Sequence, residues 1–173
     1  RISGIPTFER AEAWGVIMQA YENAICISGT HGKTTTTSMV SEILLQENTD
    51  PTLTIGGILK SIGGNIRIGK SDYFVTEACE YTNSFLSFYP KISIILNIDE
   101  DHLDFFKDLD DIRNSFRLFA QNLPEDGILI INGDIEKYEE ITDGLKCRII
   151  TFGRTKSCDY YVSNIQYDSQ GGT

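Results

Sequence analysis

The chain has 173 residues, of which 40% are hydrophobic and 23% are charged, a balance typical of a globular domain with a sizeable core. Fifteen basic and twenty-five acidic side chains give a formal net charge of −10. This charge disfavours non-specific binding to nucleic acid or to anionic membranes. No apolar run is long enough to span a bilayer and no secretory signal opens the chain, so we expect a cytoplasmic protein.

The cysteines show no Cys-x-x-Cys spacing, which argues against a zinc site. Two of them, Cys26 and Cys147, lie in apolar runs, where a small buried thiol in a reducing compartment is the ordinary interpretation. The four cysteines are Cys26, Cys79, Cys147 and Cys158.

The first part of the chain predicts a helix, a strand and a second helix. Residues 1–6 are expected to be a short connector from a preceding part of the protein. From Phe8 to Tyr21 apolar side chains repeat at helical spacing, and Thr7 is the expected N-cap. Residues 24–27 predict a buried strand, and a second helix is expected from Lys33 to about Glu47. The expected apolar faces are Ala13, Trp14, Ile17, Met18 and Tyr21 in the first helix, and Met39, Val40, Ile43 and Leu44 in the second.

The loop between the first strand and the second helix has the layout of a nucleotide-phosphate cradle. Gly29 and Gly32 let the backbone approach an anion, and the N–H groups of the first helical turn are unpaired donors. Lys33 is placed to reach the outer phosphates, and the Thr34 hydroxyl to hold Mg²⁺. The common phosphate-loop pattern has a glycine where this chain has Ile27. Phosphate binding is predicted for Gly29, Thr30, His31, Gly32, Lys33, Thr34 and Thr35.

A hairpin or flap is expected after the second helix. Residues 52–55 are prone to form a strand, and glycine pairs follow at 56–57 and 63–64. Ile66 and Ile68 alternate with polar residues after the second pair, as in a hairpin. Two interpretations stay open for this segment: a simple surface loop, or a lid near the phosphates.

The rest of the chain alternates between predicted strands and helices, which indicates an α/β fold with a mainly parallel sheet and helices on both faces. Strands are expected at 73–76, 92–96, 128–131 and 147–152, with an edge strand at 160–167, a helix around 112–120 and a short helix ending at Glu140.

Acidic residues and a histidine follow two of these strands, and in parallel sheets ligands bind beyond the carboxyl ends of the strands. An acidic group such as Glu77 is costly there unless it is solvated, paired or bound to a metal. Glu77 is therefore a predicted Mg²⁺ ligand, with a solvated loop acid as the alternative, and Glu80 is its weaker neighbour. His102 has three open interpretations: a surface histidine, a helix-start contact or a second metal ligand. His31 is expected to pack or cap, without a catalytic role.

Three ordered segments, 29–37, 77–85 and 97–104, are similar to motifs of the central ATPase domain of the Mur ligase family. The resemblance covers roughly residues 5–152 and implies a truncated P-loop-type ATPase core that uses ATP and Mg²⁺. It also implies roles for individual residues. Catalysis would involve Lys33, Glu77 and His102; metal binding Thr34, Glu77 and His102; and substrate binding Glu80, Asn83 and Ser84.

The reaction that the resemblance implies is ATP-dependent amide-bond formation in peptidoglycan synthesis. The lactyl carboxylate of UDP-N-acetylmuramate would attack the γ-phosphate of ATP, and the amine of L-alanine would then attack the acyl phosphate. The motifs most resemble the family member that adds L-alanine. The alternatives are the member that adds a tripeptide to the same nucleotide sugar, a folylpolyglutamate synthetase with the same ATPase core, and a nucleotide-binding module without catalysis.

Two departures from the family pattern matter. Where several sister ligases carry a carbamoylated lysine, an ungapped count lands on Arg117, which cannot be carbamoylated. The family enzymes also have an N-terminal UDP-binding domain and a C-terminal amino-acid domain. We therefore expect residues 1–6 to be the connector from that N-terminal domain and residues 7–173 to be an incomplete central domain. On its own it is expected to be inactive and to lack the adenine contacts; its oligomeric state stays open.

Overall fold

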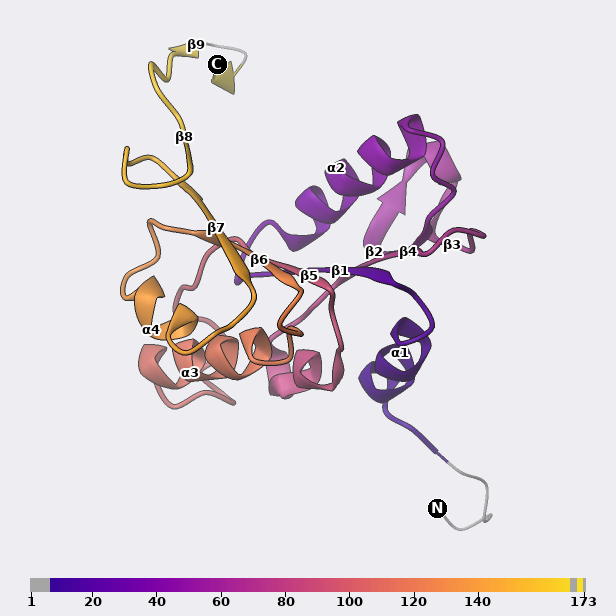
Figure 1. Ribbon diagram of the computed structural model, residues 1–173, viewed down its shortest axis with the longest axis horizontal. Helices are drawn as coiled ribbons and strands as arrows, with labels where there is room; N and C mark the ends of the chain where they lie inside the picture. The colour runs from indigo at the N-terminus through magenta and orange to yellow at the C-terminus, as the bar shows by residue number, and fades with distance from the viewer. Residues whose placement is uncertain (1–6, 169–170, 173) are drawn as a thin grey trace.

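The computed structural model describes residues 7–168 and 171–172, which form a sheet of eight strands with helices on both faces, and one further strand pair (Figure 1). The elements in chain order are α1 (Arg10–Met18), β1 (Asn23–Ser28), α2 (Lys33–Gln46), β2 (Thr52–Leu59), η1 (Lys60–Ile62), β3 (Gly64–Arg67), β4 (Tyr73–Glu77), η2 (Tyr81–Ser87), β5 (Ile92–Ile95), α3 (Leu109–Ala120), β6 (Ile128–Asn132), α4 (Tyr138–Thr142), β7 (Arg148–Gly153), β8 (Tyr160–Tyr161), β9 (Tyr167–Asp168) and β10 (Gly171–Gly172).

The strands of the large sheet lie in the order β3-β2-β4-β1-β5-β6-β7-β8. Only β2 and β3 pair antiparallel, and every other neighbouring pair is parallel. The predicted α/β fold with a mainly parallel sheet is confirmed. β1 lies between β4 and β5, so the loop that leaves its carboxyl end is flanked by the loops that leave β4 and β5.

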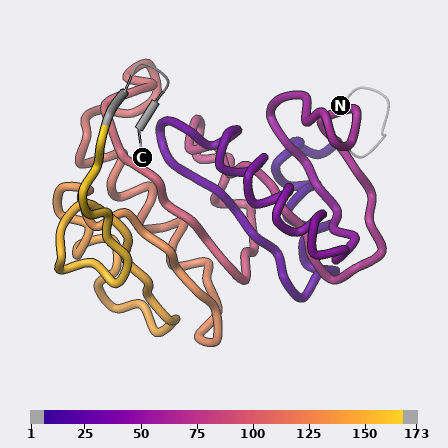
Figure 2. Tube along the Cα trace, turned by 90° about the horizontal axis from the view of Figure 1, so that it is seen from above, coloured from indigo at the N-terminus to yellow at the C-terminus, as the bar shows by residue number. Residues whose placement is uncertain are grey.

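Each face of the sheet carries its own hydrophobic core, because successive side chains of a strand point to opposite faces. In β1, Ala24 and Cys26 belong to the core that packs against α1, α3 and α4. Ile25 and Ile27 belong to the core that packs against α2. Figure 2 shows the early part of the chain at one end of the sheet and the late part at the other. Helix α2 lies across the end formed by the early part.

The first helix differs from its prediction in extent and in the buried face. α1 runs only from Arg10 to Met18, and its N-cap is Glu9 instead of Thr7. The Glu12 carboxylate accepts a hydrogen bond from the Glu9 backbone N–H at 2.9 Å, which satisfies a donor that Thr7 was expected to serve. Two side chains predicted on the apolar face are exposed instead, because the helix turns other positions toward the core. They are Ala13 and Ile17.

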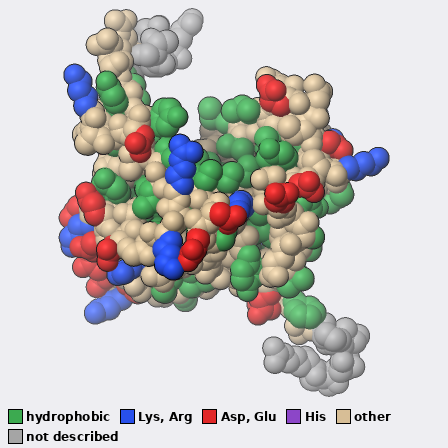
Figure 3. Space-filling model, viewed as in Figure 1, with side chains coloured by type: hydrophobic (Ala, Val, Ile, Leu, Met, Phe, Trp, Pro, Cys, Tyr) green, Lys and Arg blue, Asp and Glu red, His purple; other side chains and the backbone are tan. Residues whose placement is uncertain are grey.

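The second helix also buries a face that its apolar residues did not predict. Met39 and Ile43 are 62% and 61% exposed, whereas Thr37 and Ser41 are fully buried. The Ser41 hydroxyl donates to the Thr37 carbonyl at 2.7 Å, so its burial leaves no unpaired donor, and its small side chain fits close to the sheet. Figure 3 shows hydrophobic side chains gathered on the surface over α2.

The hairpin prediction is confirmed by the antiparallel pairing of β2 with β3, which η1 joins. The predicted edge strand at 160–167 is wrong for residues 162–166; only Tyr160–Tyr161 pair with β7, as β8. The connector at residues 1–6 lies outside the described residues. No helix in the described part of the chain is long and apolar enough to cross a membrane.

The α3 face of the sheet supplies a test of this packing. Phe119 is fully buried and stacks on Phe85 with ring centroids 4.5 Å apart, whereas its neighbour Leu118 is 42% exposed. We expect Phe119→Ala to lower the free energy of unfolding by about 3–5 kcal/mol, because it removes a ring from a close-packed core. Leu118→Ala should lower it by less than about 1 kcal/mol. Urea unfolding of both variants measures this, and equal losses would contradict the packing.

Candidate functional site

The functional residues predicted from the sequence gather beyond the carboxyl ends of β1, β4 and β5. The chain leaves β1 at Ser28, β4 at Glu77 and β5 at Ile95. In the sheet β1 pairs with both of the other strands, and the register places Ile27 opposite Glu77 and Ser28 opposite Ile95. The three loops therefore begin at the same edge, as expected for the ligand-binding edge of a parallel sheet.

Backbone geometry in the loop after β1 requires its glycines. Gly29 has a φ of +139° and Gly32 a φ of +82°, conformations that side chains with a Cβ atom rarely adopt. A Cβ atom on Gly29 would also lie 3.0 Å from Cβ of Leu96. Gly32 is the N-cap of α2, so the helix begins directly after the loop and its free N–H groups face the same edge.

Asn97, which follows β5, holds the middle of this loop. Its side-chain oxygen accepts from the His31 N–H at 2.7 Å, and its amide donates to the His31 carbonyl at 3.0 Å. The Asn97 carbonyl accepts from the Thr30 N–H at 3.1 Å. The Thr30 hydroxyl in turn accepts from the Asp99 N–H at 2.9 Å. The loop is thus fixed by the segment after β5. The His31 side chain is exposed, with its Nε2 3.9 Å from Asp99 Oδ2.

The Lys33 ammonium lies at the centre of the site. It donates to the carbonyls of Gly29 and Thr30 and to both carboxylate oxygens of Glu80, at 3.0 and 3.3 Å. Lys33 and Glu80 are only 15% and 2% exposed. Glu80 therefore contacts the lysine of the loop, and its carboxylate is buried behind it.

Thr34 and Glu77 form a second pair beside Lys33. The Thr34 hydroxyl donates to Glu77 Oε2 at 3.0 Å, and the Gly56 N–H of β2 donates to Glu77 Oε1 at 2.5 Å. A Cβ atom on Gly56 would lie 2.8 Å from both carboxylate oxygens. The Glu77 carboxylate thus packs against the backbone of Gly56. A larger residue at position 56 would displace the carboxylate.

The Thr34 hydroxyl and the Glu77 carboxylate have the oxygen chemistry that fits Mg²⁺, which proteins usually hold through one or two carboxylates, with phosphates and water completing the octahedron. The described residues contain no group of three or more His, Cys, Asp or Glu side chains placed to hold a metal ion by themselves.

His102 lies on the Glu80 side of the site. Its Nε2 is 3.9 Å from Glu80 Oε1 and its Nδ1 is 3.9 Å from Asp101 Oδ1, with the side chain 33% exposed. Its backbone has a φ of +53°, a strained conformation of the kind found at functional sites. The structure thus links His102 to Lys33 through Glu80, while Glu77 pairs with Thr34.

A cleft of about 780 Å³ opens at this edge. Among the predicted residues it is lined by Lys33, Glu77, Asn83 and Ser84, whereas Glu80 and His102 do not line it. The β2–β3 hairpin contributes Gly56, Asn65 and Ile66 to the wall. The hairpin therefore borders the cleft, as expected for the lid interpretation.

The segment after β4 is held in an unusual conformation where it borders the cleft. Thr82 and Asn83 have φ values of 54° and 57°, in the left-handed region that a β-branched residue rarely enters. The Ser84 hydroxyl donates to the carbonyls of Cys79 and Tyr81 at 2.9 and 3.0 Å. The Asn83 side chain accepts from the Ser115 hydroxyl of α3. These contacts fix the wall that Asn83 and Ser84 present.

Two residues of the site, Gly56 and Asn97, were not assigned a role from the sequence. The glycine pair at 56–57 predicted a hairpin or flap without a contact to Glu77, and Asn97 was part of a motif without a function of its own. Both act through contacts between segments far apart in the chain, which a local pattern does not contain. Arg117 of α3 lies 3.8 Å from Asp143 and does not line the cleft.

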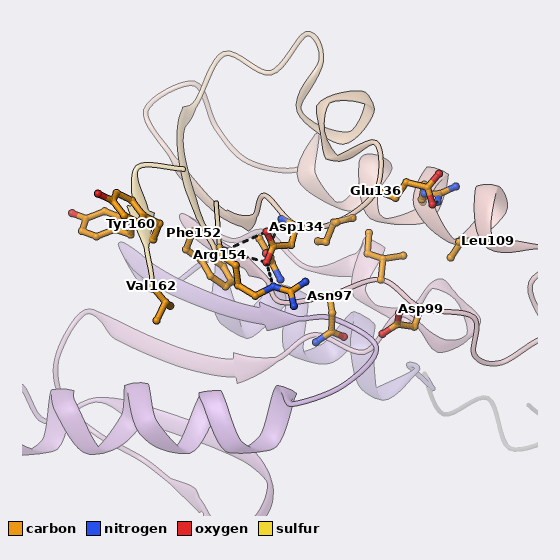
Figure 4. Close-up of a pocket in the computed structure, with 15 residues that line it drawn as sticks. Asn97, Asp99, Leu109, Asp134, Glu136, Phe152, Arg154, Tyr160 and Val162 are labelled. Atoms are coloured by element: carbon orange, nitrogen blue, oxygen red, sulfur yellow. Dashed lines mark hydrogen bonds and ion pairs between the residues drawn. The ribbon is translucent and has the colours of Figure 1, made fainter. Parts of the chain in front are cut away.

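A second cavity, of about 770 Å³, lies beyond β5, β6 and β7 (Figure 4). Its polar centre is Asp134, which accepts from Arg154 Nε at 2.9 Å. This ion pair lowers the pKa of Asp134 below its ordinary value. The aromatic rings of Phe152 and Tyr160 line the same cavity, and of the residues predicted for phosphate or metal binding it includes none.

Residues 27–173 match the family model of the Mur ligase middle domain. Over 170 residues the chain is 61% identical to a UDP-N-acetylmuramate–L-alanine ligase of Lachnospira eligens, a match that covers 98% of this chain and 37% of that protein. The chain thus spans little more than a third of the length of this curated relative.

Two solved structures are also similar. The alanine ligase of Thermotoga maritima is 28% identical, with a TM-score of 0.73 over 88% of this chain and 33% of its own. The UDP-N-acetylmuramate:L-alanyl-γ-D-glutamyl-meso-diaminopimelate ligase of Neisseria meningitidis shares the fold at 24% identity, with a TM-score of 0.83 over 97% of this chain and 56% of its own. The match to the family model covers most of the chain, and the chain therefore belongs to the Mur ligase middle domain family.

Proposed function

We propose that this chain is the phosphate- and metal-binding part of a ligase that adds L-alanine to UDP-N-acetylmuramate with ATP. The observation that carries the proposal is the meeting of Lys33, Thr34 and Glu77 at the end of β1 and β4. The 61% identity to an alanine-adding ligase supports the choice of substrates. Residues 7–173 would form the central domain, and residues 1–6 the connection to a UDP-binding domain.

In this function the loop and Lys33 hold the ATP phosphates. The backbone N–H groups from Gly32 to Thr35, at the start of α2, bind phosphate oxygens, and the positive end of the α2 dipole adds to their attraction. Those of Thr30 and His31 are already bonded to Asn97. Lys33 neutralises the outer phosphates as a point charge. Thr34 and Glu77 are the proposed ligands of Mg²⁺, with His102 as a ligand of a second ion. Mg²⁺, when bound, withdraws charge from the phosphate oxygens.

The chemical difficulty of the reaction is that two anions must meet. The substrate carboxylate attacks the γ-phosphate of ATP, and each repels the other unless positive groups offset the charge and align them. Lys33 supplies a fixed positive charge in a largely buried position, where it acts more strongly than in water. Asn83 and Ser84 line the cleft and are proposed to contact the nucleotide sugar, whereas Glu80, buried behind Lys33, does not reach it directly.

The first attack expels ADP and leaves an acyl phosphate. The amine of L-alanine then attacks the acyl carbon, phosphate leaves from the tetrahedral intermediate, and the nitrogen loses a proton to give the amide. The net charge of −10 supports a protein that acts without nucleic acid or membrane partners, and we place it in the cytoplasm.

The substrates are tested with the full-length protein, UDP-N-acetylmuramate and ATP. Phosphate release should require L-alanine, and the tripeptide L-alanyl-γ-D-glutamyl-meso-diaminopimelate should not replace it. Release only with the tripeptide would assign the chain to the tripeptide-adding ligases. Binding of Mg-ATP without phosphate release under any of these conditions would favour a nucleotide-binding module without catalysis.

Lys33→Ala and Glu77→Ala in the full-length protein should each lower the rate of ligation by about a hundredfold or more, because each removes charge stabilisation at the transferred phosphate. Initial-rate measurements at saturating substrates check this. Melting curves of the same variants separate lost catalysis from lost folding, since Lys33→Ala leaves Glu80 without its partner. A Glu77→Ala enzyme with activity within a few-fold of the parent would refute the metal role of Glu77.

Gly56→Ala tests whether the backbone at Gly56 positions the Glu77 carboxylate. The added methyl would lie 2.8 Å from its oxygens, so the carboxylate must move. The Mg²⁺ concentration that gives half of the maximal rate should rise by about tenfold, as for other changes to groups that orient a metal ligand. Gly64→Ala is the matched control, because a Cβ atom there meets nothing within 4 Å. Equal Mg²⁺ titrations for the two variants would contradict the arrangement.

His102→Ala should act through metal binding. The expected result is a higher Mg²⁺ requirement at saturating ATP, with ATP affinity little changed, because Lys33 and the loop remain intact. Initial rates as a function of Mg²⁺ concentration measure this. An unchanged Mg²⁺ titration would show that His102 is not a metal ligand.

A further inference from the structure

Tyr81 is the residue in closest aromatic contact with His102. The two ring centroids lie 4.5 Å apart with an angle of 35° between the rings, within the range of favourable aromatic pairs. Tyr81 belongs to the segment after β4 and His102 to the segment after β5. The contact therefore joins the two segments that carry Glu77 and His102.

The Tyr81 ring is itself held at both ends. Its hydroxyl donates to Asp104 Oδ2 at 2.8 Å, and the ring of Phe105 packs edge-on against it at 6.1 Å. Its backbone carbonyl accepts from the Ser84 hydroxyl at 3.0 Å. A ring fixed in this way has little freedom to turn, so it can act as a support.

His102 needs such a support. Its side chain is 33% exposed, so burial does not fix the imidazole. Its carbonyl accepts from the N–H groups of Phe105 and Phe106, which fixes the backbone but leaves the ring free to rotate. The nearest charged groups, on Glu80 and Asp101, lie 3.9 Å from the imidazole nitrogens, too far for a short hydrogen bond.

We propose that Tyr81 is a positioning residue that holds the His102 imidazole in the orientation needed for metal binding. The ring supports the imidazole face, and the bond to Asp104 keeps the ring in place. The inference rests on the proposed metal role of His102. It assigns Tyr81 no contact with the metal. Groups that orient a metal ligand typically contribute about tenfold to a hundredfold to metal affinity.

The test compares Tyr81→Phe and Tyr81→Leu in the full-length protein. Tyr81 is 38% exposed, so neither change opens the core. Tyr81→Leu removes the ring and should raise half-saturating Mg²⁺ about tenfold, with the dissociation constant for ATP unchanged within about twofold. Tyr81→Phe keeps the ring and loses only the bond to Asp104, and should have a smaller effect.

The double variant Tyr81→Leu/His102→Ala separates positioning from general damage. If Tyr81 acts through His102, adding Tyr81→Leu to His102→Ala should change the Mg²⁺ requirement no further. Additive effects on the Mg²⁺ requirement would overturn the proposal. So would a loss of activity in Tyr81→Leu that is fully explained by a lower melting temperature. A higher KM for the nucleotide sugar alone would overturn it in favour of a direct substrate contact.

An NMR measurement distinguishes this proposal from the metal role of His102. In protein labelled with ¹³C-histidine, the His102 ring signal is the one missing from His102→Ala. Tyr81→Leu should shift this signal more than Tyr81→Phe, because the ring current disappears only with the ring. An unshifted signal in Tyr81→Leu would refute the contact. A shifted signal with unchanged Mg²⁺ titrations of His102→Ala would leave Tyr81 as a support and refute the metal role.

Discussion

The contact between the Lys33 ammonium and the Glu80 carboxylate joins the two halves of the site. Lys33 begins α2 after the loop from β1, and Glu80 lies in the segment after β4. Both groups are mostly buried, and a buried charge that loses its partner is strongly destabilising. The loop carbonyls of Gly29 and Thr30 share the same ammonium. The position of Lys33, the proposed phosphate ligand, therefore depends on Glu80, and the position of Glu80 depends on Lys33.

This contact also indicates how the site responds to a nucleotide. Without phosphate, the ammonium is satisfied by carbonyl and carboxylate oxygens of the protein. A bound triphosphate offers oxygens with more negative charge, which compete for the same donor. Glu80 would then remain near His102, whose Nε2 is 3.9 Å away. In this account Glu80 contacts Lys33 before ATP binds and lies beside His102 when the ammonium turns to the phosphates.

The sequence was sufficient for the fold and for the residues at the sheet edge. Short apolar runs followed by glycine or acidic residues predicted β1, β4 and β5 and the loops after them, because a parallel sheet brings those ends together. The faces of α1 and α2 were predicted less well. Thr37 and Ser41 are buried where Met39 and Ile43 were expected, since the fit to the sheet, and not hydrophobicity alone, decides which face packs.

The contacts that hold the site were beyond prediction from sequence because they join distant segments. Gly56 donates to Glu77 across 21 positions, and Asn97 binds the loop at His31 across 66 positions. Neither contact has a local pattern. The pairing of His102 with Glu80 and Tyr81, apart from Glu77, likewise depends on how the segments after β4 and β5 fold back.

The most direct test of the central claim is a crystal structure of the full-length protein with Mg²⁺ and a non-hydrolysable ATP analogue. We predict phosphate oxygens on the N–H groups of Gly32 to Thr35, where the loop after β1 becomes α2, and the Lys33 ammonium bonded to the outer phosphates. Mg²⁺ should lie about 2.0–2.1 Å from the Thr34 hydroxyl and from a Glu77 carboxylate oxygen. Phosphates bound elsewhere, with Lys33 still on the carbonyls of Gly29 and Thr30, would contradict the account.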